Sequence, residues 1–395
     1  MAIRPLEGHM QYYDWGSSTS LASLQGRPVP SPHCEAELWF GAHPDGPAKV
    51  HTDGRRVPLA EWIEADPEGR LGAAVVARFG AELPFLLKLL AVARPLSLQV
   101  HPDSEKAQEG FARERRGSGV PDKERRYRDA RHKPELVCAL SPFHALQGFR
   151  PWPEIQERLR GAGVYGGLPG LEALAERPAP ETGRALLKSL LTVEPRAGSA
   201  LVRGAAAWAQ GSEDPSLAWL VRLAEAYPDD PAALAPLFLD FVELQPGQGL
   251  YLPPGELHCY LEGFAIELMA SSDNVVRAGL TSKPVDVPEL LRLTRFAPRP
   301  AQPLDAEPTS AAEAVFAPPV SEFRLSLIRT GAASAHRVPA SGSLEILLCV
   351  EGRARVGADG SELRAGTAAV VPADAGAYSV RGEAVLYRAW VPSPD

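Results

Sequence analysis

The chain has 395 residues, which is long enough for two or three domains that each bury a core. Its net charge of −8 leaves no basic field over the molecule, which argues against a nucleic-acid partner. No apolar run approaches the roughly 18 residues of a membrane span, so we expect no membrane partner. The four cysteines form no C-x-x-C pair and no apolar signal segment opens the sequence, so we expect a cytoplasmic protein. We also expect a monomer.

The first 150 residues are rich in Gly, Pro and short apolar runs, a texture typical of strands joined by turns. The predicted strands lie at residues 36–44, 83–103 and 134–140, and a charged helix is predicted at 103–118. From about 151 to 240 the chain is rich in Ala and Leu with a helical period, which predicts an inserted helical domain. Strand character returns at 241–263.

These patterns predict a mainly β fold with a helical insert and a second β domain. The first β domain is expected to be discontinuous, comprising residues 1–150 and 241–298, and the α-helical insert to comprise residues 151–240. A segment rich in Pro and Ala at 299–319 is predicted to be a linker, and residues 320–395 to form the second β domain.

A faint internal repeat, L-x-x-G-x-x-x-x-x-P, links the two β domains. Its copies are Leu244, Gly247 and Pro253, and Leu363, Gly366 and Pro372. Each copy predicts a turn that leads into a strand of a small barrel or jelly roll. His258 follows the first copy by five residues, whereas Ala377 occupies that position after the second, so only the first domain is expected to keep metal-binding chemistry. A chance match of common turn residues explains the repeat equally well.

Four polar residues of the β segments form a candidate metal site: Gln99, His101, Glu135 and His258. Gln99 and His101 are two residues apart, so they share one face of a strand and can reach one ion. A set of two imidazoles, one carboxylate and one amide oxygen suits zinc or another divalent first-row ion, with room for water or substrate. Taken singly, each residue has a plainer explanation, since an isolated His in a strand is more often a hydrogen-bonded structural residue.

The stretch HCYLEGFAIELMASSDNVVRAGLTSK (258–283) concentrates further polar side chains around an apolar strand. Arg277 and Lys283 are candidates for binding phosphate, because Arg suits a bidentate contact and Lys acts as a point charge. Their alternative role is surface solubility. Tyr260 is equally explained as an aromatic residue at a barrel rim, and Glu267 as a solvent-facing strand residue.

This stretch resembles the long signature of type I mannose-6-phosphate isomerases, H-A-Y-x-x-G-x-x-x-E-x-M-A-x-S-D-N-x-x-R-A-G-x-T-P-K. The departures are Cys259 in place of Ala and Ser282 in place of Pro. YRDARHKPE (127–135) is similar to a second family motif, Y-x-D-x-N-H-K-P-E, with Arg131 in place of Asn. Weaker matches in kind and order occur at YDWGS, AELWFGAHP, FLLKLL, LSLQVHPD and SPFHALQGFRP. The resemblance covers about the first 300 residues and is faint in the helical insert and the last β domain.

The resemblance implies a cupin-type jelly roll that interconverts mannose 6-phosphate and fructose 6-phosphate. Its partner would be a small-molecule sugar phosphate. The metal would be one Zn²⁺ per chain on Gln99, His101, Glu135 and His258. The resemblance also places Arg277 in the active site, as a phosphate or transition-state contact. The C-terminal domain is then expected to be jelly-roll-like and to lack metal ligands.

An aldose–ketose isomerisation moves a proton between C1 and C2 through an enediol, so it requires a general base beside the metal. Catalytic roles are expected for His132, Lys133, Asp273 and Arg277. Of these, Lys133 and Asp273 are favoured for proton transfer, and Lys133 would share the face of Glu135 if the strand continued through Pro134. Substrate contacts are expected from Ser97, Tyr260, Glu267 and Lys283.

Two other functions stay open. One is a cupin-type oxygenase with a redox-active iron on the predicted ligands other than Gln99, and the cations Arg277 and Lys283 argue against it. The other is a sugar-phosphate-binding cupin without turnover, which would be expected to lose some of the catalytic candidates. The Arg-dense run at 113–133 is interleaved with Asp and Glu, so we predict a mobile solvated loop there, with a lid near the substrate phosphate as a further hypothesis.

Overall fold

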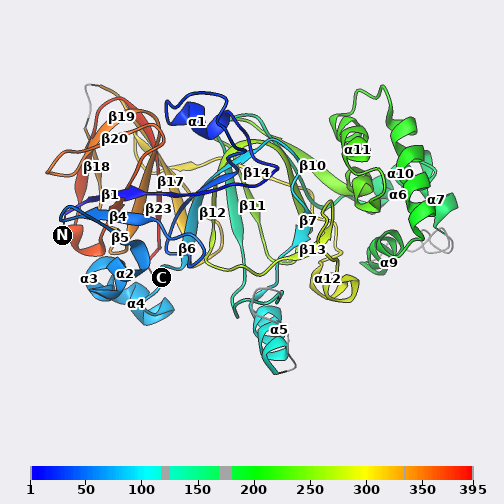
Figure 1. Cartoon of the computed structure of the whole chain (residues 1–395), viewed down its shortest axis with the longest axis horizontal. Helices are drawn as coiled ribbons and strands as arrows, with labels where there is room; N and C mark the ends of the chain where they lie inside the picture. Colours follow the sequence, from blue (N-terminus) through cyan, green and yellow to red (C-terminus); the bar gives the residue numbers. More distant parts are fainter. Residues whose placement is uncertain (1, 117–124, 169–179, 333–334, 394–395) are drawn as a thin grey trace.

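The computed structural model describes residues 2–116, 125–168, 180–332 and 335–393. The molecule is elongated, with two β units side by side and a group of helices beyond the first unit (Figure 1). Both ends of the chain lie in the second unit. The mainly β fold with a helical insert and a second β unit is therefore as predicted. No helix among these residues is long and apolar enough to cross a membrane.

The first β unit is built on an antiparallel sheet whose centre is the long strand β12. Its strands are β2 (His9–Gln11), β3 (Glu37–Phe40), β6 (Phe85–Val92), β7 (Leu98–Val100), β8 (Glu135–Ala139), β9 (Phe143–Phe149), β10 (Leu239–Leu244), β11 (Gly249–Leu252), β12 (His258–Ala270), β13 (Val276–Gly279) and β14 (Pro303–Leu304). The first half of β12 pairs with β7 and β9, and its second half pairs with β6 and β8. Gly263 lies at this bend with φ +134°, and a Cβ there would lie 2.7 Å from the Pro142 carbonyl oxygen. A glycine therefore lets one strand serve both parts of the sheet.

The second β unit contains the C-terminal strands and, unexpectedly, three N-terminal ones. Its strands are β1 (Arg4–Glu7), β4 (Lys49–Thr52), β5 (Arg55–Pro58), β15 (Glu307–Pro308), β16 (Glu313–Phe316), β17 (Arg324–Thr330), β18 (Ala335–Val338), β19 (Glu345–Val356), β20 (Ser361–Arg364), β21 (Ala368–Val371), β22 (Tyr378–Arg381) and β23 (Ala384–Trp390). β1 pairs with β21, so that Arg4 lies opposite Val370, and β4 and β5 follow in the same sheet. The expected domain boundaries stay a proposal, which we amend by assigning these three strands to the second unit.

The helices of the insert form one core with the outer face of the first sheet. They are α6 (Trp152–Gly161), α7 (Val164–Gly167), α9 (Pro180–Leu191), α10 (Pro195–Ala209), α11 (Pro215–Ala226) and the 3₁₀ helix η2 (Pro231–Leu237). The sequence determines where these helices begin. For example, α11 begins at Pro215, and the Asp214 carboxylate before it accepts a hydrogen bond from the Ser216 N–H at 2.8 Å. Leu220 of α11 then shares a buried cluster with Leu146 and Cys259 of the sheet.

The remaining helices surround the two β units. They are α1 (Ser20–Leu24), α2 (Leu59–Glu64), α3 (Pro67–Leu71), α4 (Ala73–Phe79), α5 (Ser104–Arg116) and α12 (Val287–Leu293). The helix predicted at 103–118 is α5, which projects from the lower face of the first unit (Figure 1). The run 113–133, predicted to be a mobile loop, begins inside this helix, and its residues 117–124 lie outside the described residues.

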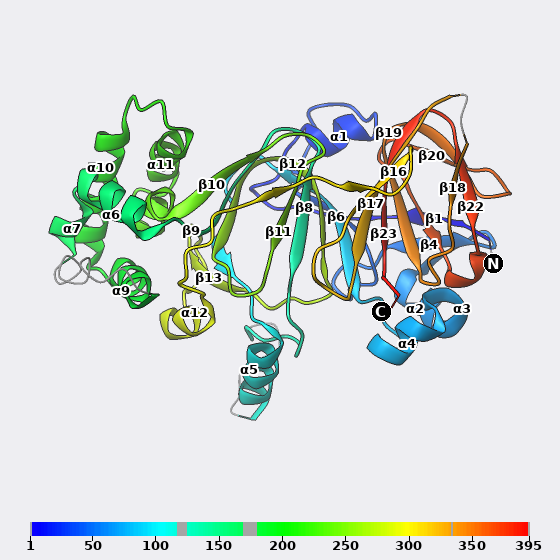
Figure 2. The ribbon, with the colours of Figure 1, turned by 180° about the vertical axis from the view of Figure 1, so that it is seen from behind.

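A second core joins the two β units. In Figure 2, β8 and β6 of the first unit lie next to β17 and β23 of the second. Leu136 of β8 and Leu268 of β12 are buried there with Leu325 of β17. Because side chains alternate along a strand, this contact turns Glu135 and Glu267 toward the inside of the first unit. The packing of the two units thus directs polar residues inward, where the candidate site lies.

Candidate metal centre and active site

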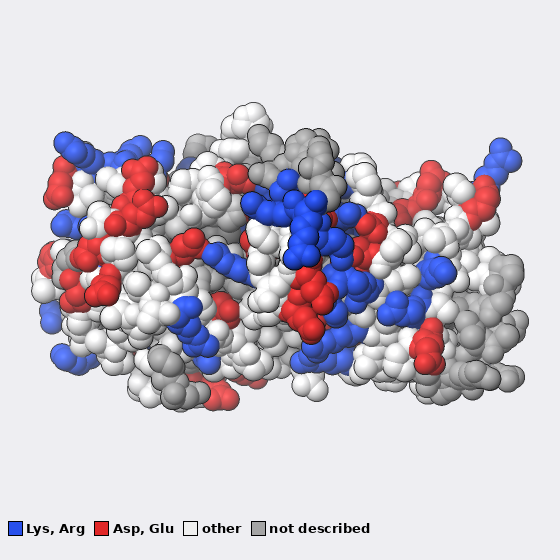
Figure 3. Space-filling view, turned by 90° about the horizontal axis from the view of Figure 1, so that it is seen from below, with Lys and Arg blue, Asp and Glu red and all other residues white. Residues whose placement is uncertain are grey.

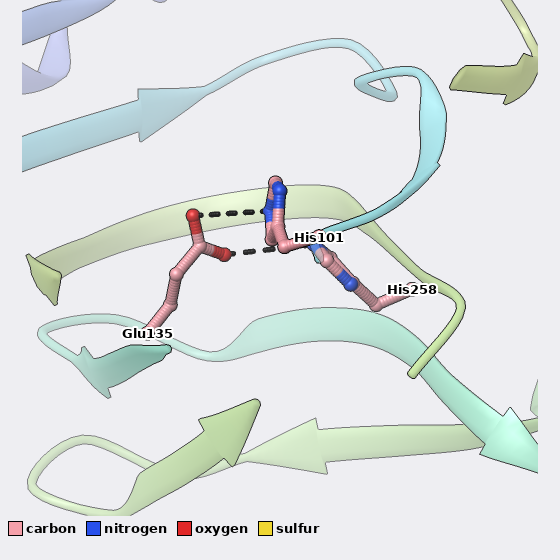
Figure 4. A group of neighbouring side chains, drawn as sticks. All are labelled: His101, Glu135 and His258. Carbon is pink, nitrogen blue, oxygen red and sulfur yellow. Dashed lines mark ion pairs between the residues drawn. The ribbon is translucent and has the colours of Figure 1, made fainter. Parts of the chain in front are cut away.

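Three predicted ligands come together inside the first β unit: His101, Glu135 and His258. Their donor atoms all lie within 4.8 Å of one another. The Nε2 atom of His101 is 3.3 Å from Glu135 Oε1, and that of His258 is 3.5 Å from Glu135 Oε2 (Figure 4). All three side chains are at most 2% exposed. The residues come from β8, from the start of β12 and from just beyond β7, so the sheet itself holds the cluster.

Backbone hydrogen bonds direct the Nε2 lone pairs of both imidazoles into the cluster. The Nδ1 atom of His101 lies 2.8 Å from the Asn274 carbonyl oxygen, and that of His258 lies 2.9 Å from the Glu256 carbonyl oxygen. A carbonyl only accepts, so Nδ1 carries the hydrogen in both rings. His101 Nε2 and Glu135 Oε2 are buried and have no hydrogen-bond partner in the described part of the chain. Buried polar atoms without partners are costly, and a divalent cation would satisfy them, so these residues fit a metal site.

Gln99 completes the predicted set through strand register. It lies opposite His258 on β12 and opposite Arg277 on β13, so these three residues form a row across adjacent strands. The Gln99 amide nitrogen is 3.3 Å from His258 Nε2. A half-turn of the amide would present its oxygen instead as a fourth donor. Ser97, a predicted substrate contact, donates its hydroxyl hydrogen to Gln99 Oε1 at 3.4 Å.

Burial and charge set the protonation states that a metal requires. Burial, with His101 nearby, lowers the pKa of His258 to about 4, and burial also lowers the pKa of His101. Burial alone would raise the pKa of Glu135, but the ammonium of Lys133 and the His101 ring more than offset it and hold that pKa below its usual range. Two neutral imidazoles beside an ionised carboxylate form a ligand set ready for a cation.

Lys133 lies in the site beside Glu135, on the face that the sequence predicted for it. Its Nζ is 3.0 Å from Glu135 Oε1, and the side chain is buried. The segment before it is fixed by Asn274, whose amide nitrogen donates to the carbonyl oxygens of Asp129 and Arg131 at 2.9 Å each. The signature stretch therefore orients the segment that carries Lys133. The Arg131 side chain pairs with Glu82 on the surface, so the backbone geometry tolerates Arg in place of Asn.

A buried ion cluster that sequence reasoning missed lies on the neighbouring strands. Lys88 Nζ is 3.1 Å from Glu267 Oε2 and 3.5 Å from Glu37 Oε1. The Trp39 indole donates to Glu37 Oε2 at 2.7 Å. Glu267 is therefore buried and paired, and its alternative as a solvent-facing residue is wrong. The available signal was Lys88 itself, a lone cation in FLLKLLAV, whose eight residues are all buried.

Tyr260 is buried beside this cluster. Its ring packs against Phe143 and His258 at 5.4 and 6.1 Å between ring centroids. The hydroxyl is buried without a hydrogen-bond partner of good geometry, and burial together with Glu267 raises its pKa well above the usual value. It is thus a neutral donor inside the unit, not an aromatic residue at an exposed rim.

Arg277 and Lys283 form a positive region, and no carboxylate within the described ranges pairs with Arg277. Across residues 2–116, 125–168, 180–332 and 335–393, no ion pair or side-chain hydrogen bond to Arg277 is present. Burial, with Arg128 nearby, lowers the pKa of Arg277, and the charge of Arg277 in turn lowers the pKa of exposed Lys283. Two neighbouring cations repel each other, and a bound anion would offset this repulsion. The pair therefore favours binding of an anion beside the metal cluster.

Asp273 and His132 have partners that the sequence did not indicate. Asp273 Oδ1 accepts from His43 Nε2 at 3.1 Å, since the Asp45 N–H occupies His43 Nδ1. Burial opposes ionisation, but the His43 hydrogen bond lowers the pKa of Asp273 to about 2, so it is a weak base. His132 donates from Nε2 to Glu322 Oε1 of the second unit at 2.7 Å, whereas the adjacent Lys133 faces Glu135.

Ion pairs also hold the described part of the Arg-dense run. Arg126 pairs with Glu114 and Asp286, and Arg128 Nη1 is 3.1 Å from Asp45 Oδ2. Lys and Arg side chains gather in the middle of the face seen from below, with acidic residues among them (Figure 3). A cavity of about 560 Å³ lined by Arg128, Asp273 and other residues lies beside this segment. Of the run 113–133 that was predicted to be a mobile loop, residues 113–116 belong to α5 and residues 117–124 lie outside the described residues.

Comparison with known proteins agrees with this geometry. Residues 3–152 match the family model for the phosphomannose isomerase type I catalytic domain. The chain is 39% identical to the mannose-6-phosphate isomerase of Escherichia coli (strain K12), over 98% of this chain and 99% of the relative. It is 34% identical to the human mannose-6-phosphate isomerase, over 89% and 88% of the two chains.

Solved structures show the same likeness over almost the whole chain. A mutant phosphomannose isomerase from Salmonella typhimurium superposes with a TM-score of 0.92 at 36% identity, covering 99% of this chain and all of that one. A zinc-bound mannose 6-phosphate isomerase superposes with a TM-score of 0.91 at 37% identity and the same coverage. The relatives therefore share both β units and the helical insert, and this chain belongs to the family of type I mannose-6-phosphate isomerases.

Proposed function

We propose that the protein interconverts mannose 6-phosphate and fructose 6-phosphate, with one zinc ion held by Gln99, His101, Glu135 and His258. The observation that carries this proposal is the cluster of two imidazole lone pairs and a carboxylate in register with the unpaired guanidinium of Arg277. A relative at 37% identity is described as zinc-bound, which supports zinc among the divalent ions that the donor set suits.

Each candidate residue then has a role set by its position. The zinc ion, when bound, supplies a Lewis acid that polarises the sugar carbonyl and stabilises negative charge at the enediol oxygens. Lys133 is the better candidate of the two for proton transfer, because Asp273 is ionised and already bonded to His43. Arg277 and Lys283 bind the phosphate through unneutralised charge.

The remaining residues orient the sugar. Among the described residues, the Tyr260 hydroxyl makes no hydrogen bond of good geometry, so we assign it a hydrogen bond to a substrate hydroxyl. Glu267, fixed by Lys88, lies on the same inward face and orients the hydroxyls or the ligand set. Ser97 acts through Gln99. We further propose that the protein acts as a cytoplasmic monomer on a small sugar phosphate.

The test is coupled turnover of mannose 6-phosphate to fructose 6-phosphate before chelation, after chelation and after zinc is added back. Activity that is lost to the chelator and restored by zinc is the expected result. Oxygen consumption that depends on iron would instead support an oxygenase. Tight binding of sugar phosphate without turnover in the zinc-replete protein would support a binding function. Either outcome would overturn the proposal.

A further inference from the structure

A partly buried hydrogen bond connects the second β unit to the segment that carries Lys133. Glu322 lies between β16 and β17 of that unit, and its Oε1 accepts from His132 Nε2 at 2.7 Å. His132 directly precedes Lys133, whose Nζ contacts Glu135. A residue of the C-terminal half therefore holds the residue next to the proposed proton-transfer group.

The Glu322 carboxylate is also held by hydrogen bonds other than the one from His132. Its Oε2 accepts from the Ser321 backbone N–H at 3.0 Å and from the Ser321 hydroxyl at 3.2 Å. The next residue, Phe323, is fully buried in the core that joins the two β units. Burial opposes ionisation, but the hydrogen bond from His132 lowers the pKa of Glu322, so the pair is a charge-assisted one. Glu322 is thus a rigid, ionised acceptor and not a flexible surface side chain.

The segment from residue 129 to Glu135 is held on two flanks. On one flank, the Asn274 amide donates to the carbonyl oxygens of Asp129 and Arg131 at 2.9 Å each. On the other flank, Glu322 holds His132. Beyond it the Pro134 carbonyl accepts from the Ala270 N–H at 3.1 Å, and the segment then enters β8. The Glu322 contact comes from the second unit, whereas Asn274 and Ala270 belong to the first.

We propose that Glu322 is a positioning residue of the active site, by which the second β unit fixes Lys133 and Glu135 through His132. This inference rests on the proposed function, because it gives Lys133 a role in proton transfer. It also gives the second β unit a part in the reaction, although that unit supplies none of the proposed metal ligands. A carboxylate that orients a neighbouring imidazole is a recurrent way of holding an active-site element in place.

The test compares Glu322→Ala and Glu322→Gln with the matched control Glu7→Ala. Glu7 also accepts from a histidine, His51 at 2.9 Å, but the pair lies on β1 and β4 of the second unit, away from the site. The first readout is amide hydrogen exchange of the segment 129–135, which does not depend on activity. We expect the segment to exchange faster in Glu322→Ala than in the parent protein. The increase should be smaller in Glu322→Gln, because the new amide oxygen still accepts from His132. In Glu7→Ala the exchange rate should not change.

The second readout is turnover with zinc content measured in each variant. We expect kcat to fall roughly tenfold in Glu322→Ala, with KM and zinc content held, and to recover largely in Glu322→Gln. Unchanged exchange, or unchanged kcat despite faster exchange, would overturn the inference.

If Glu322→Ala does not fold, the same measurements are made on His132→Gln, with His51→Gln as its control. If the unmodified protein does not turn over the sugar phosphate, the proposed function fails, while the exchange measurement still decides whether Glu322 holds the segment.

Discussion

The two β units are built alike around a buried cation, but they differ in the groups that surround it. In the first, Lys88 lies between Glu37 and Glu267 with Tyr260 nearby. In the second, the corresponding residues are Arg388, Glu313, Glu345 and Tyr378. Arg388 is 2.6 Å from Glu313 and 3.1 Å from Glu345, and the Tyr378 hydroxyl donates to Glu345 at 2.5 Å. In the second cluster, Arg388 and Tyr378 pair with the carboxylates. The first unit also holds His101 and Glu135, whose Nε2 and Oε2 atoms lack hydrogen-bond partners among the described residues.

The turns that lead to these clusters correspond as the internal repeat predicts. Gly247 and Gly366 both adopt left-handed conformations, with φ of +91° and +79°, and each precedes a strand that ends at the repeated proline. After the first of these strands comes His258, and after the second comes Ala377. The comparison teaches that the two units share the backbone of the turn and the strand. A few substitutions on that backbone decide whether its polar atoms pair with one another or stay available to a ligand.

Removing a metal ligand from the first unit should have the largest effect. We expect His258→Ala to lose zinc and to lower kcat/KM at least roughly a thousandfold, because metal polarisation of a carbonyl is worth several kcal/mol. Zinc analysis and coupled turnover measure both. His336→Ala, which removes a partly buried histidine of the second unit, should retain zinc and turnover. Full zinc occupancy in His258→Ala would contradict the assigned ligand set.

Breaking the ion cluster of the second unit should instead affect stability. Arg388→Met leaves Glu313 and Glu345 buried without their cation, so we expect the free energy of unfolding to fall by about 3–5 kcal/mol. Turnover per folded molecule should hold in the temperature range where the variant is folded. Urea denaturation and active-site-normalised rates test the two statements. A variant as stable as the parent protein would show that the cluster contributes little.

Replacing Arg277 by Lys should have a moderate effect on the first unit. The change keeps the charge but removes the planar, bidentate donor, so we expect kcat/KM for the sugar phosphate to fall roughly tenfold. The exposed Arg329 on β17 of the second unit is the matched control, and Arg329→Lys should leave the rate unchanged. Equal rates in both variants would remove Arg277 from the phosphate site.

The smallest effect is expected at Asp273, and it depends on pH. The pKa of Asp273 in the folded protein is about 2, below the usual value near 3.8. The ionised carboxylate therefore stabilises the fold fully at pH values above 3.8, and this stabilisation is lost as the pH falls through about 2. The side chain is 31% exposed, so we expect Asp273→Asn to lower the free energy of unfolding by only about 1–2 kcal/mol at pH 7. The difference from the parent protein should narrow in denaturation curves as the pH falls from about 4. A difference that grows at low pH would contradict the sign.

The candidate ligands can be found in the sequence because their signals are local. Gln99 lies in β7 and His101 directly follows the last residue of that strand, so the extended chain places both on one face. Lys133 and Glu135 follow the same rule, and the structure brings them to 3.0 Å. Helix and strand positions in the insert and in β8 to β12 follow from composition and period in the same way.

Interactions between distant segments carry no such signal. Nothing in the neighbourhood of His43 indicates that it bonds to Asp273, and nothing near His132 indicates Glu322. The roles of these partners depend on how two units pack, which a periodic pattern does not encode. Lys88 is intermediate: its charge within an apolar strand signals a buried partner, but not which carboxylates supply it.

The pairing of β1 with β21 has a consequence for how the chain assembles. Arg4 cannot pair with Val370 until the chain has been synthesised as far as β21, so β1 exists long before one of its two partner strands. During that interval β1 and its neighbour β4 present open edges, which are prone to wrong pairing. Synthesis at reduced temperature, or with a chaperone that covers exposed strands, should therefore raise the yield of native protein more than any change at the metal centre.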